Sequence, residues 1–163
     1  MELKITRMSA EDVNGAFGVI KAAFEKFVAP GYTREGILEF YKFANPLAMR
    51  RRLPESLMLS AKSEDDAIVG VIEVKDLKHI SLLFVLPEHH KKGIARQLVK
   101  RAETICGAHV SLEVNASPYA VPAYQQLGFQ AQIGEQEQNG IRFVPMLKPC
   151  APVPLKPPQD KGK

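Results

Sequence analysis

The sequence predicts a single domain of mixed α/β (α+β) class, and three observations support this prediction. The chain has 163 residues, 45% of them hydrophobic, which is enough for one full core and too little for two ordinary domains. Strand and helix patterns follow one another in the order β-α-α-β-β-β-α-β-α-β-β. Between residues 83 and 95, an apolar strand pattern leads through a loop to a glycine that opens an amphipathic helix.

The N-terminal part contains a short strand, residues 3–6, and two helices. Ser9 and Asp12 form a capping-box pattern at the start of the first helix, which Pro30 and Gly31 end. Its apolar residues share one face: Val13, Ala16, Phe17, Ile20, Phe24 and Phe27. Thr33 can cap the second helix, which stops before Asn45 and Pro46.

The rest of the domain alternates between the two element types. Three strands are expected at residues 57–61, 67–75 and 78–85, joined by turns at 63–66 and 76–77. A helix from Ile94 to Cys106 and a strand at 110–114 follow. A second helix around Tyr124 then leads to a hairpin of residues 130–136 and 141–147, which turns around Asn139 and Gly140.

The segment from residue 83 to 95 has the features of an anion site. The first N–H groups of a helix lack intrahelical partners and lie at the positive end of the helix dipole. Gly93 precedes such a helix, and it leaves the backbone accessible because it has no side chain. The loop therefore fits a pyrophosphate, although glycines also occur in ordinary strand-to-helix connections.

Two motifs occur in this part of the chain. The first is Val85-Leu86-Pro87 followed by His-Lys-Lys-Gly-Ile-Ala at residues 90–95. The second is Asn115 after a strand, then a helix with Ala120, Tyr124, Gly128 and Phe129 in the spacing A-x-x-x-Y-x-x-x-G-F. With both motifs in this order, the chain resembles the GNAT superfamily of N-acetyltransferases, whose central motif is V-x-P followed by Q/R-x-x-G-x-G/A.

The resemblance implies a fold and a co-substrate. The expected sheet is mostly antiparallel and flanked by helices, with splayed fourth and fifth strands that hold acetyl-CoA between them. The pantetheine pairs with the open edge of the fourth strand, and the loop amides bind the pyrophosphate. His90 stands where the family usually has glutamine or arginine, so only backbone contacts carry over there. The cofactor-binding positions are Phe84, Val85, His90, Lys91, Lys92, Gly93, Ile94, Ala95, Arg96 and Asn115.

The resemblance also implies catalytic roles. Tyr124 is at the family's proton-donor position near the sulfur, whereas the alternative is a tyrosine that only packs on the core with its hydroxyl bound to backbone. A general base must deprotonate the acceptor ammonium. Glu73 and His79 are the candidates, with Glu73 slightly preferred because it lies in an otherwise apolar strand.

The expected function is acetyl transfer from acetyl-CoA to a primary amine by direct attack in a ternary complex. A non-catalytic acyl-CoA-binding or sensing module on the same fold is the alternative. The acceptor, a small-molecule or peptide amine, is expected between the first two helices and the final hairpin. The residues there are largely aromatic and apolar, with Tyr32 and Tyr41 as polar tips, which suggests a partly apolar or aromatic-lined entrance. The sequence leaves open whether the protein forms a homodimer.

Composition excludes several other classes. The net charge is +4, but residues 149–163 contribute half of it, and an aromatic-rich basic strand is missing, so nucleic-acid binding is not expected. The two cysteines, Cys106 and Cys150, lack a second ligand pair, which argues against a metal site. A signal peptide or membrane span is not visible, and we expect a cytoplasmic protein without membrane contact. Residues 1–148 are expected to form the domain, and 149–163 an extended or disordered proline-rich tail.

Overall fold

The computed structural model describes residues 2–149, so the predicted tail lies outside the described residues except for Pro149. The strands are β1 Lys4–Arg7, β2 Leu57–Lys62, β3 Ile68–Lys75, β4 His79–Val85, β5 Leu112–Ala116, β6 Gln130–Ala131, β7 Gln136–Gln138 and β8 Ile141–Lys148. The α-helices are α1 Val13–Ala23, α2 Arg34–Phe43, α3 Pro46–Arg52, α4 Ile94–Cys106 and α5 Val121–Gln126.

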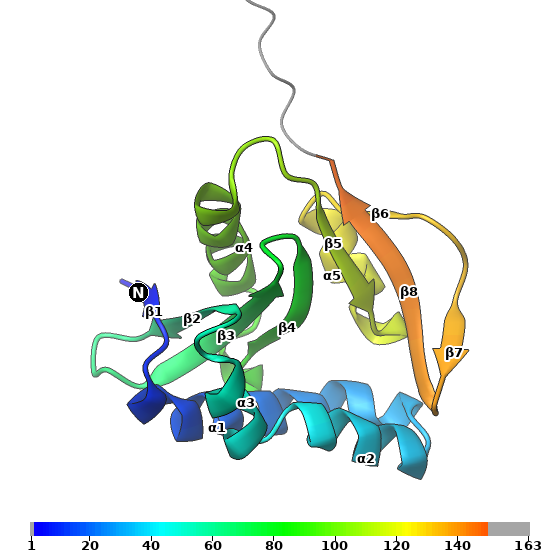
Figure 1. Ribbon diagram of the computed structural model, residues 1–163, viewed down its shortest axis with the longest axis horizontal. Helices are drawn as coiled ribbons and strands as arrows, with labels where there is room; N and C mark the ends of the chain where they lie inside the picture. The colour runs from blue at the N-terminus through cyan, green and yellow to red at the C-terminus, as the bar shows by residue number, and fades with distance from the viewer. Residues whose placement is uncertain (1, 150–163) are drawn as a thin grey trace, which may run out of the picture.

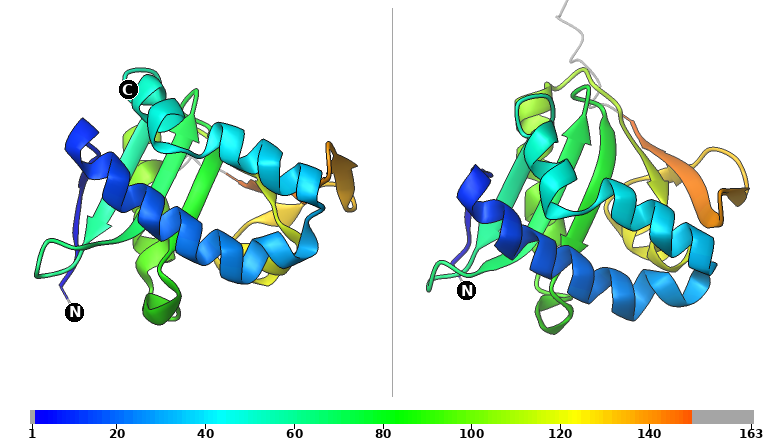
Figure 2. Two further views of the ribbon diagram at one scale, coloured as in Figure 1. Left: turned by 90° about the horizontal axis from the view of Figure 1, so that it is seen from below. Right: turned by 60° about the horizontal axis from the view of Figure 1, so that its bottom comes forward.

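The strands form a sheet in the order β1-β2-β3-β4-β5-β8-β6, with β7 added to β8 as a hairpin. All pairs are antiparallel except β4 and β5. Helices α1 and α2 cross one face of the sheet, and α4 and α5 lie on the other (Figures 1 and 2). The predicted mixed α/β class with a mostly antiparallel sheet is therefore confirmed.

Strands β4 and β5 splay apart, as the resemblance implied. They pair only at His79 with Glu113 and at Ile80 with Val114, and then diverge (Figure 1). The register between β3 and β4 shifts at the same level, because Glu73 pairs with Leu82 and Val74 with Ile80. Ser81 is left without a partner in β3 and forms a bulge, which bends the strand. The bend opens a wedge between β4 and β5.

Two buried clusters, one on each face, hold these layers together. On the α1 face, helix residues such as Ile20 and Met49 pack against Met58, Val71 and Leu82 of the sheet. On the other face, the apolar stripe of α4 packs against β2 to β5, and its predicted residues Ile94, Leu98, Val99 and Ala102 are all buried. The point at which β4 and β5 separate lies between the two clusters, so packing on both faces of the sheet fixes its position.

The first helix departs from its predicted pattern near its end. Its start is confirmed, since the Ser9 N–H donates to Asp12 Oδ2 at 2.9 Å. After Ala23, however, the helix widens into a π-helical turn at Phe24–Val28. One extra residue in that turn rotates the following side chains. Phe24 stays buried, but Phe27 is half-buried and belongs to neither core cluster, so its predicted place on the core stripe is wrong.

Helix α3 was missed because Asn45 and Pro46 were interpreted only as a stop signal. Asn45 caps the new helix by accepting from the Ala48 N–H at 3.0 Å, and Pro46 occupies its first turn. The final hairpin is confirmed around Asn139 and Gly140, with its first predicted strand divided into β6 and β7. A Cβ on Gly36 would lie 2.2 Å from the Gly140 carbonyl oxygen, so two glycines bring α2 against the hairpin tip.

Candidate active site

The loop before α4 presents unpaired backbone amides. Gly93 has φ +77° and caps the helix, and the first helical bond runs from the Gln97 N–H to the Gly93 carbonyl at 3.1 Å. The N–H groups of Ile94, Ala95 and Arg96 therefore precede the hydrogen-bonded part of the helix. Lys91 and Lys92 are exposed beside them, so positive charge surrounds a positive helix end.

Two further side chains near the start of α4, Arg96 and His90, are bonded to the rest of the protein. Arg96 Nη2 donates to the Gln126 carbonyl at the end of α5, 3.1 Å away. The Arg96 side chain is therefore engaged, and its backbone N–H is the group left for a ligand. His90 Nε2 lies 2.8 Å from the Val85 carbonyl oxygen. The unusual histidine therefore connects the loop to the strand before it.

The open edge of β4 is formed by alternate residues. The Leu86 N–H donates to the Val69 carbonyl of β3 at 2.9 Å. In an antiparallel pair the backbone groups of successive residues alternate in direction, so those of Leu83 and Val85 face the wedge. The backbone of Phe84 faces β3, and its ring packs edge-on against Phe40 at 5.9 Å. Of the two residues, it is therefore Leu83 and not the predicted Phe84 whose backbone groups face the wedge.

Tyr124 lies on α5, on the α4 side of the wedge. Its side chain is 8% exposed, and its ring meets Phe129 edge-on with centroids 5.3 Å apart. Burial raises the pKa of the Tyr124 hydroxyl well above its ordinary value, so the group stays protonated. Within residues 2–149 burial is the one cause of this shift, and no hydrogen bond of the hydroxyl to backbone contributes to it. A protonated hydroxyl can donate to a ligand.

Glu73 is held in an ion pair. Arg52 donates from Nε to Glu73 Oε2 at 2.8 Å and from Nη2 to Oε1 at 3.0 Å, and Glu73 is 1% exposed. Arg52 also donates to the Phe43 carbonyl and stacks on the Phe43 ring. Both carboxylate oxygens are occupied and Glu73 lines neither of the cavities described below, so the structure argues against it as the general base.

His79 has a carboxylate partner that the sequence analysis did not identify. Its Nδ1 lies 3.2 Å from Glu113 Oε1, across the first of the two levels at which β4 and β5 pair. A carboxylate can only accept, so Nδ1 carries the proton in this pair and Nε2 of a neutral ring is left as an acceptor. His79 and Glu113 both line a cavity of about 220 Å³.

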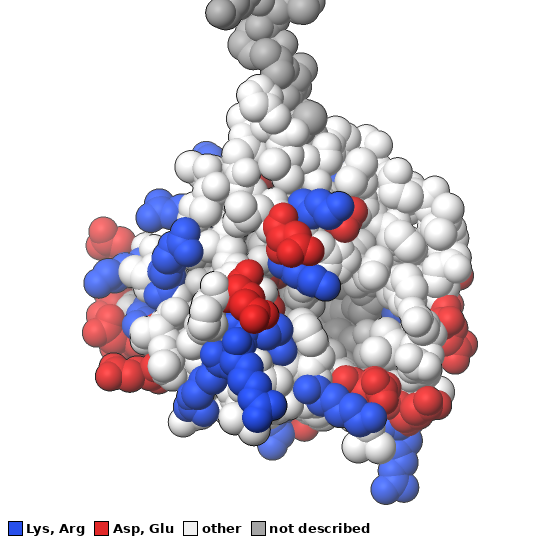
Figure 3. Space-filling view, in the orientation of Figure 1, with Lys and Arg blue, Asp and Glu red and all other residues white. Residues whose placement is uncertain are grey.

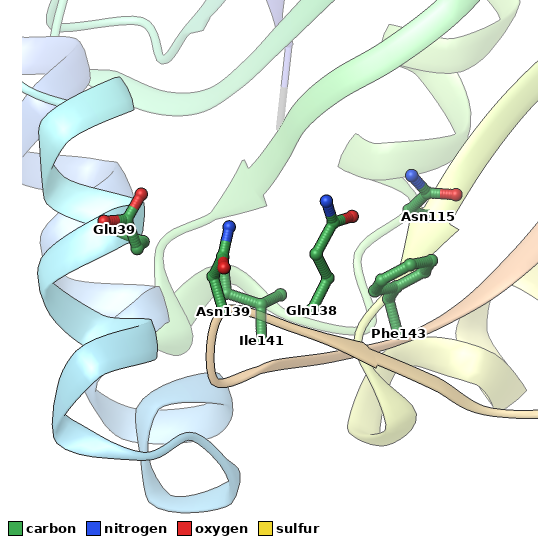
Figure 4. A pocket seen from close by; sticks show the side chains of 6 residues that line it. All are labelled: Glu39, Asn115, Gln138, Asn139, Ile141 and Phe143. Carbon is green, nitrogen blue, oxygen red and sulfur yellow. The ribbon is translucent and has the colours of Figure 1, made fainter.

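A second cavity, of about 350 Å³, adjoins the first at Asn115. Glu39 of α2, residues of the hairpin and Asn115 point into it together (Figure 4). Asn115 alternates with the buried Val114 and Ala116, so its side chain lies on the α2 side of the sheet. The surface is hollowed above α2, and charged side chains lie on several sides of this hollow (Figure 3). Through their shared residue Asn115 we treat the two cavities as one hollow. We call this hollow the acceptor groove.

Tyr32 and Tyr41, on which the expected entrance rested, do not line the groove. Its lining consists of carboxylate, amide and apolar groups and includes the Phe143 ring of the hairpin. The Tyr41 hydroxyl donates to Glu25 at 3.0 Å, and burial together with that contact raises the pKa of Tyr41 to about 12. The aromatic rings between α1 and α2 pack on one another instead, with the Phe24 and Phe40 centroids 3.8 Å apart.

Two searches of the described part of the chain were negative. Residues 2–149 contain no group of three or more His, Cys, Asp and Glu side chains placed to hold a metal ion. In that same range, none of the helices has the length and apolar character needed to cross a membrane.

A family profile described as an acetyltransferase (GNAT) domain matches residues 28–150. The chain belongs to the GNAT acetyltransferases. This confirms the resemblance that the two motifs carried, and the match includes the wedge, the α4 loop and Tyr124.

Solved GNAT structures share the fold at low sequence identity. A GCN5-related N-acetyltransferase from Rhodopseudomonas palustris is 24% identical, with a TM-score of 0.77 over 91% of this chain and 96% of the other. PaiA N-acetyltransferase from Thermoplasma acidophilum in complex with coenzyme A is 21% identical, with a TM-score of 0.75 over 91% and 99%. An aminoglycoside 6'-N-acetyltransferase complexed with coenzyme A is 14% identical, with a TM-score of 0.63 over 93% and 99%.

Proposed function

We propose that this GNAT domain transfers the acetyl group of acetyl-CoA to a primary amine by direct attack in a ternary complex. The observation that carries the proposal is the continuity between the β4 edge that faces the wedge and the unpaired amides at the start of α4. Leu83 and Val85 lie on that edge, and of their backbone groups the Val85 carbonyl is bonded by His90. One extended pantetheine could pair with that edge and reach the amides with its pyrophosphate. The coenzyme A complexes of two compared GNAT proteins support this co-substrate.

The two substrates approach from opposite faces of the sheet. Acetyl-CoA lies on the α4 and α5 side, where Tyr124 is buried, and the amine enters through the acceptor groove. The side chain of Asn115 lies in that groove, so we assign it to the acceptor side rather than to the cofactor. The faces meet only where β4 and β5 splay, and that is the place for the thioester.

His79 and Tyr124 perform the proton transfers in this proposal. His79 Nε2 takes a proton from the acceptor ammonium, while Glu113 holds the ring through Nδ1 and stabilises its positive charge. The neutral amine attacks the thioester carbonyl, a C–N bond forms, and the C–S bond breaks. Tyr124 donates a hydrogen bond or its proton to the leaving sulfur. The nitrogen then loses its second proton, which restores the Tyr124 hydroxyl if that group has protonated the leaving sulfur. Burial raises the pKa of the Tyr124 hydroxyl, and the same burial disfavours a free CoA thiolate beside it. Because neither anion is favoured there, the proton is shared between the tyrosine oxygen and the leaving sulfur.

The groove supports an acceptor with further polar groups. Its sides carry the Glu39 carboxylate and the amides of Asn115, Gln138 and Asn139, and among the described residues its lining contains neither lysine nor arginine. A carboxylate and amides of this kind bind a second ammonium or several hydroxyl groups. The name of the compared aminoglycoside acetyltransferase is consistent with such an acceptor.

Release of the CoA thiol is the test of this function. The protein is incubated with acetyl-CoA and a panel of monoamines, polyamines, aminoglycosides, amino acids and peptides, and the acetylated product is identified by mass spectrometry. We expect amine-dependent thiol release with one of these classes, and its loss in Tyr124→Phe. Tight binding of acetyl-CoA without amine-dependent release from any class would contradict the proposal and support a non-catalytic acyl-CoA-binding module.

A further inference from the structure

Three aromatic side chains from distant segments form a continuous stack. The rings of Phe27 and His90 are 4.8 Å apart at an angle of 25°, and those of Phe27 and Tyr119 are 5.0 Å apart at 15°. Phe27 is therefore the middle ring of three nearly parallel rings. We call Tyr119, Phe27 and His90 the ring stack.

The ring stack bridges the two sides of the wedge. His90 follows β4 and Tyr119 follows β5, so these residues belong to the two loops that diverge after the splay point. Phe27 comes from the segment after α1, which runs beneath the lower ends of both strands (Figures 1 and 2). The stack thus spans the wide end of the wedge on the α1 side.

Local features hold each ring in place. The π-helical turn rotates Phe27 away from the core stripe and toward the wedge. The bond from His90 Nε2 to the Val85 carbonyl fixes the second ring to the same strand edge that faces the wedge. Tyr119 is 57% exposed, so it closes the outer side of the stack rather than filling a core.

We propose that Phe27 is a positioning residue that seals the wide end of the wedge against water. The inference rests on the proposed function, because it concerns acetyl-CoA lying between β4 and β5. The ring stack covers the wide end of the wedge on the α1 side, which leaves the groove beside His79 and Asn115 as the route for the amine. Without the ring stack, water reaches the pantetheine arm and attacks the thioester carbonyl, which breaks the C–S bond and gives acetate and free CoA.

The test compares thiol release without any amine to thiol release with an amine. In Phe27→Ala we expect amine-independent hydrolysis of bound acetyl-CoA to rise by about tenfold, because an excluded-water site becomes solvated. Phe27→Tyr should restore the wild-type rate, since it keeps the ring. His90→Gln carries the residue that the family usually has, retains a donor for the Val85 carbonyl and removes one ring, and we expect an intermediate rise.

Phe17→Ala is the matched control. It removes a ring from the same helix, but Phe17 contacts Tyr41 and the α1-face core rather than the wedge. Hydrolysis in this variant should equal the wild-type rate, and thermal melting confirms that each variant is folded. Unchanged hydrolysis in a folded Phe27→Ala protein saturated with acetyl-CoA would overturn the seal alone. Wild-type protein that fails to bind acetyl-CoA in calorimetry would overturn the proposed function and the seal together.

Discussion

The two sides of the wedge are built from different chemical groups. On the proposed cofactor side, the groups that face the wedge are main-chain ones, at Leu83, Val85 and the start of α4. On the acceptor side they are side chains from α2, β4, β5 and the hairpin. A main-chain site tolerates substitution wherever the backbone keeps its shape, whereas a side-chain site changes with every substitution. This difference explains how one fold can keep a single co-substrate while its acceptors vary.

The largest effect is expected where the main-chain site is most vulnerable. Gly93→Asp should weaken CoA binding by on the order of 100-fold, since a carboxylate is added beside the pyrophosphate and at φ +77°. Isothermal calorimetry measures the CoA affinity of the variant. Gly93→Ala adds a side chain at the same φ without a charge, so it separates the effect of backbone strain from the effect of charge.

Gly134→Asp is the control for added charge. Gly134 lies in open space in the loop before β7, so the same substitution there should leave CoA affinity at the wild-type value. Equal affinity of wild-type and Gly93→Asp proteins would show that the pyrophosphate binds elsewhere.

Tyr124→Phe tests the cofactor side by its chemistry instead. The ring and its contact with Phe129 remain, so acetyl-CoA affinity should hold while kcat falls by roughly 100-fold if chemistry limits the rate. Pre-steady-state thiol release shows whether chemistry is limiting. A wild-type kcat under that condition would mean that Tyr124 only packs.

Substitutions of His79 and Glu113 on the acceptor side should lower kcat by different amounts. His79→Asn should lower kcat by roughly 10- to 100-fold by removing the base, and Glu113→Gln by a smaller factor, because the imidazole then loses only its ionic partner. CoA affinity should be unchanged in both. If the double variant is no slower than His79→Asn alone, the two residues act as one unit; strictly multiplied effects would contradict the pairing.

The smallest effect on turnover is expected from Glu73. Glu73→Gln leaves Arg52 without its partner, and the protein should lose roughly 3 kcal/mol of stability, a fall in Tm of the order of 10 °C. Turnover of the folded protein, measured well below Tm, should stay within about threefold of wild type. A loss comparable to that of His79→Asn would return the base role to Glu73.

The sequence predicted strand β4 and the loop before α4 well and the partners of Glu73 and His79 poorly, for a physical reason. Gly93, Pro87 and the alternating apolar residues of β4 act through local backbone geometry, which leaves a pattern over a few neighbouring positions. The pairs Arg52–Glu73 and His79–Glu113 join residues 21 and 34 positions apart. Neither pair leaves a local pattern. The strand alternation did contain a usable signal, because Glu113 and Asn115 share a face of β5 opposite to its apolar residues.

The ring stack was missed for another reason. Helical periodicity assigned Phe27 to the core, and only the π-helical turn after Ala23 changes that direction. A single inserted residue in a helix is not visible in an apolar pattern, since the residues on either side of it remain apolar.

The contact between Gly36 and Gly140 gives protein engineers a fixed point on the acceptor side. Main chain meets main chain there, and the Thr33 hydroxyl and N–H both lie 3.4 Å from the Gly140 carbonyl. Side chains at Glu39, Gln138 and Asn139 can then be exchanged in a library without separating the helix from the hairpin that carries them. Libraries that retain both glycines should yield folded proteins with altered amine preference. Randomising either glycine should instead remove the main-chain contact that holds α2 against the hairpin.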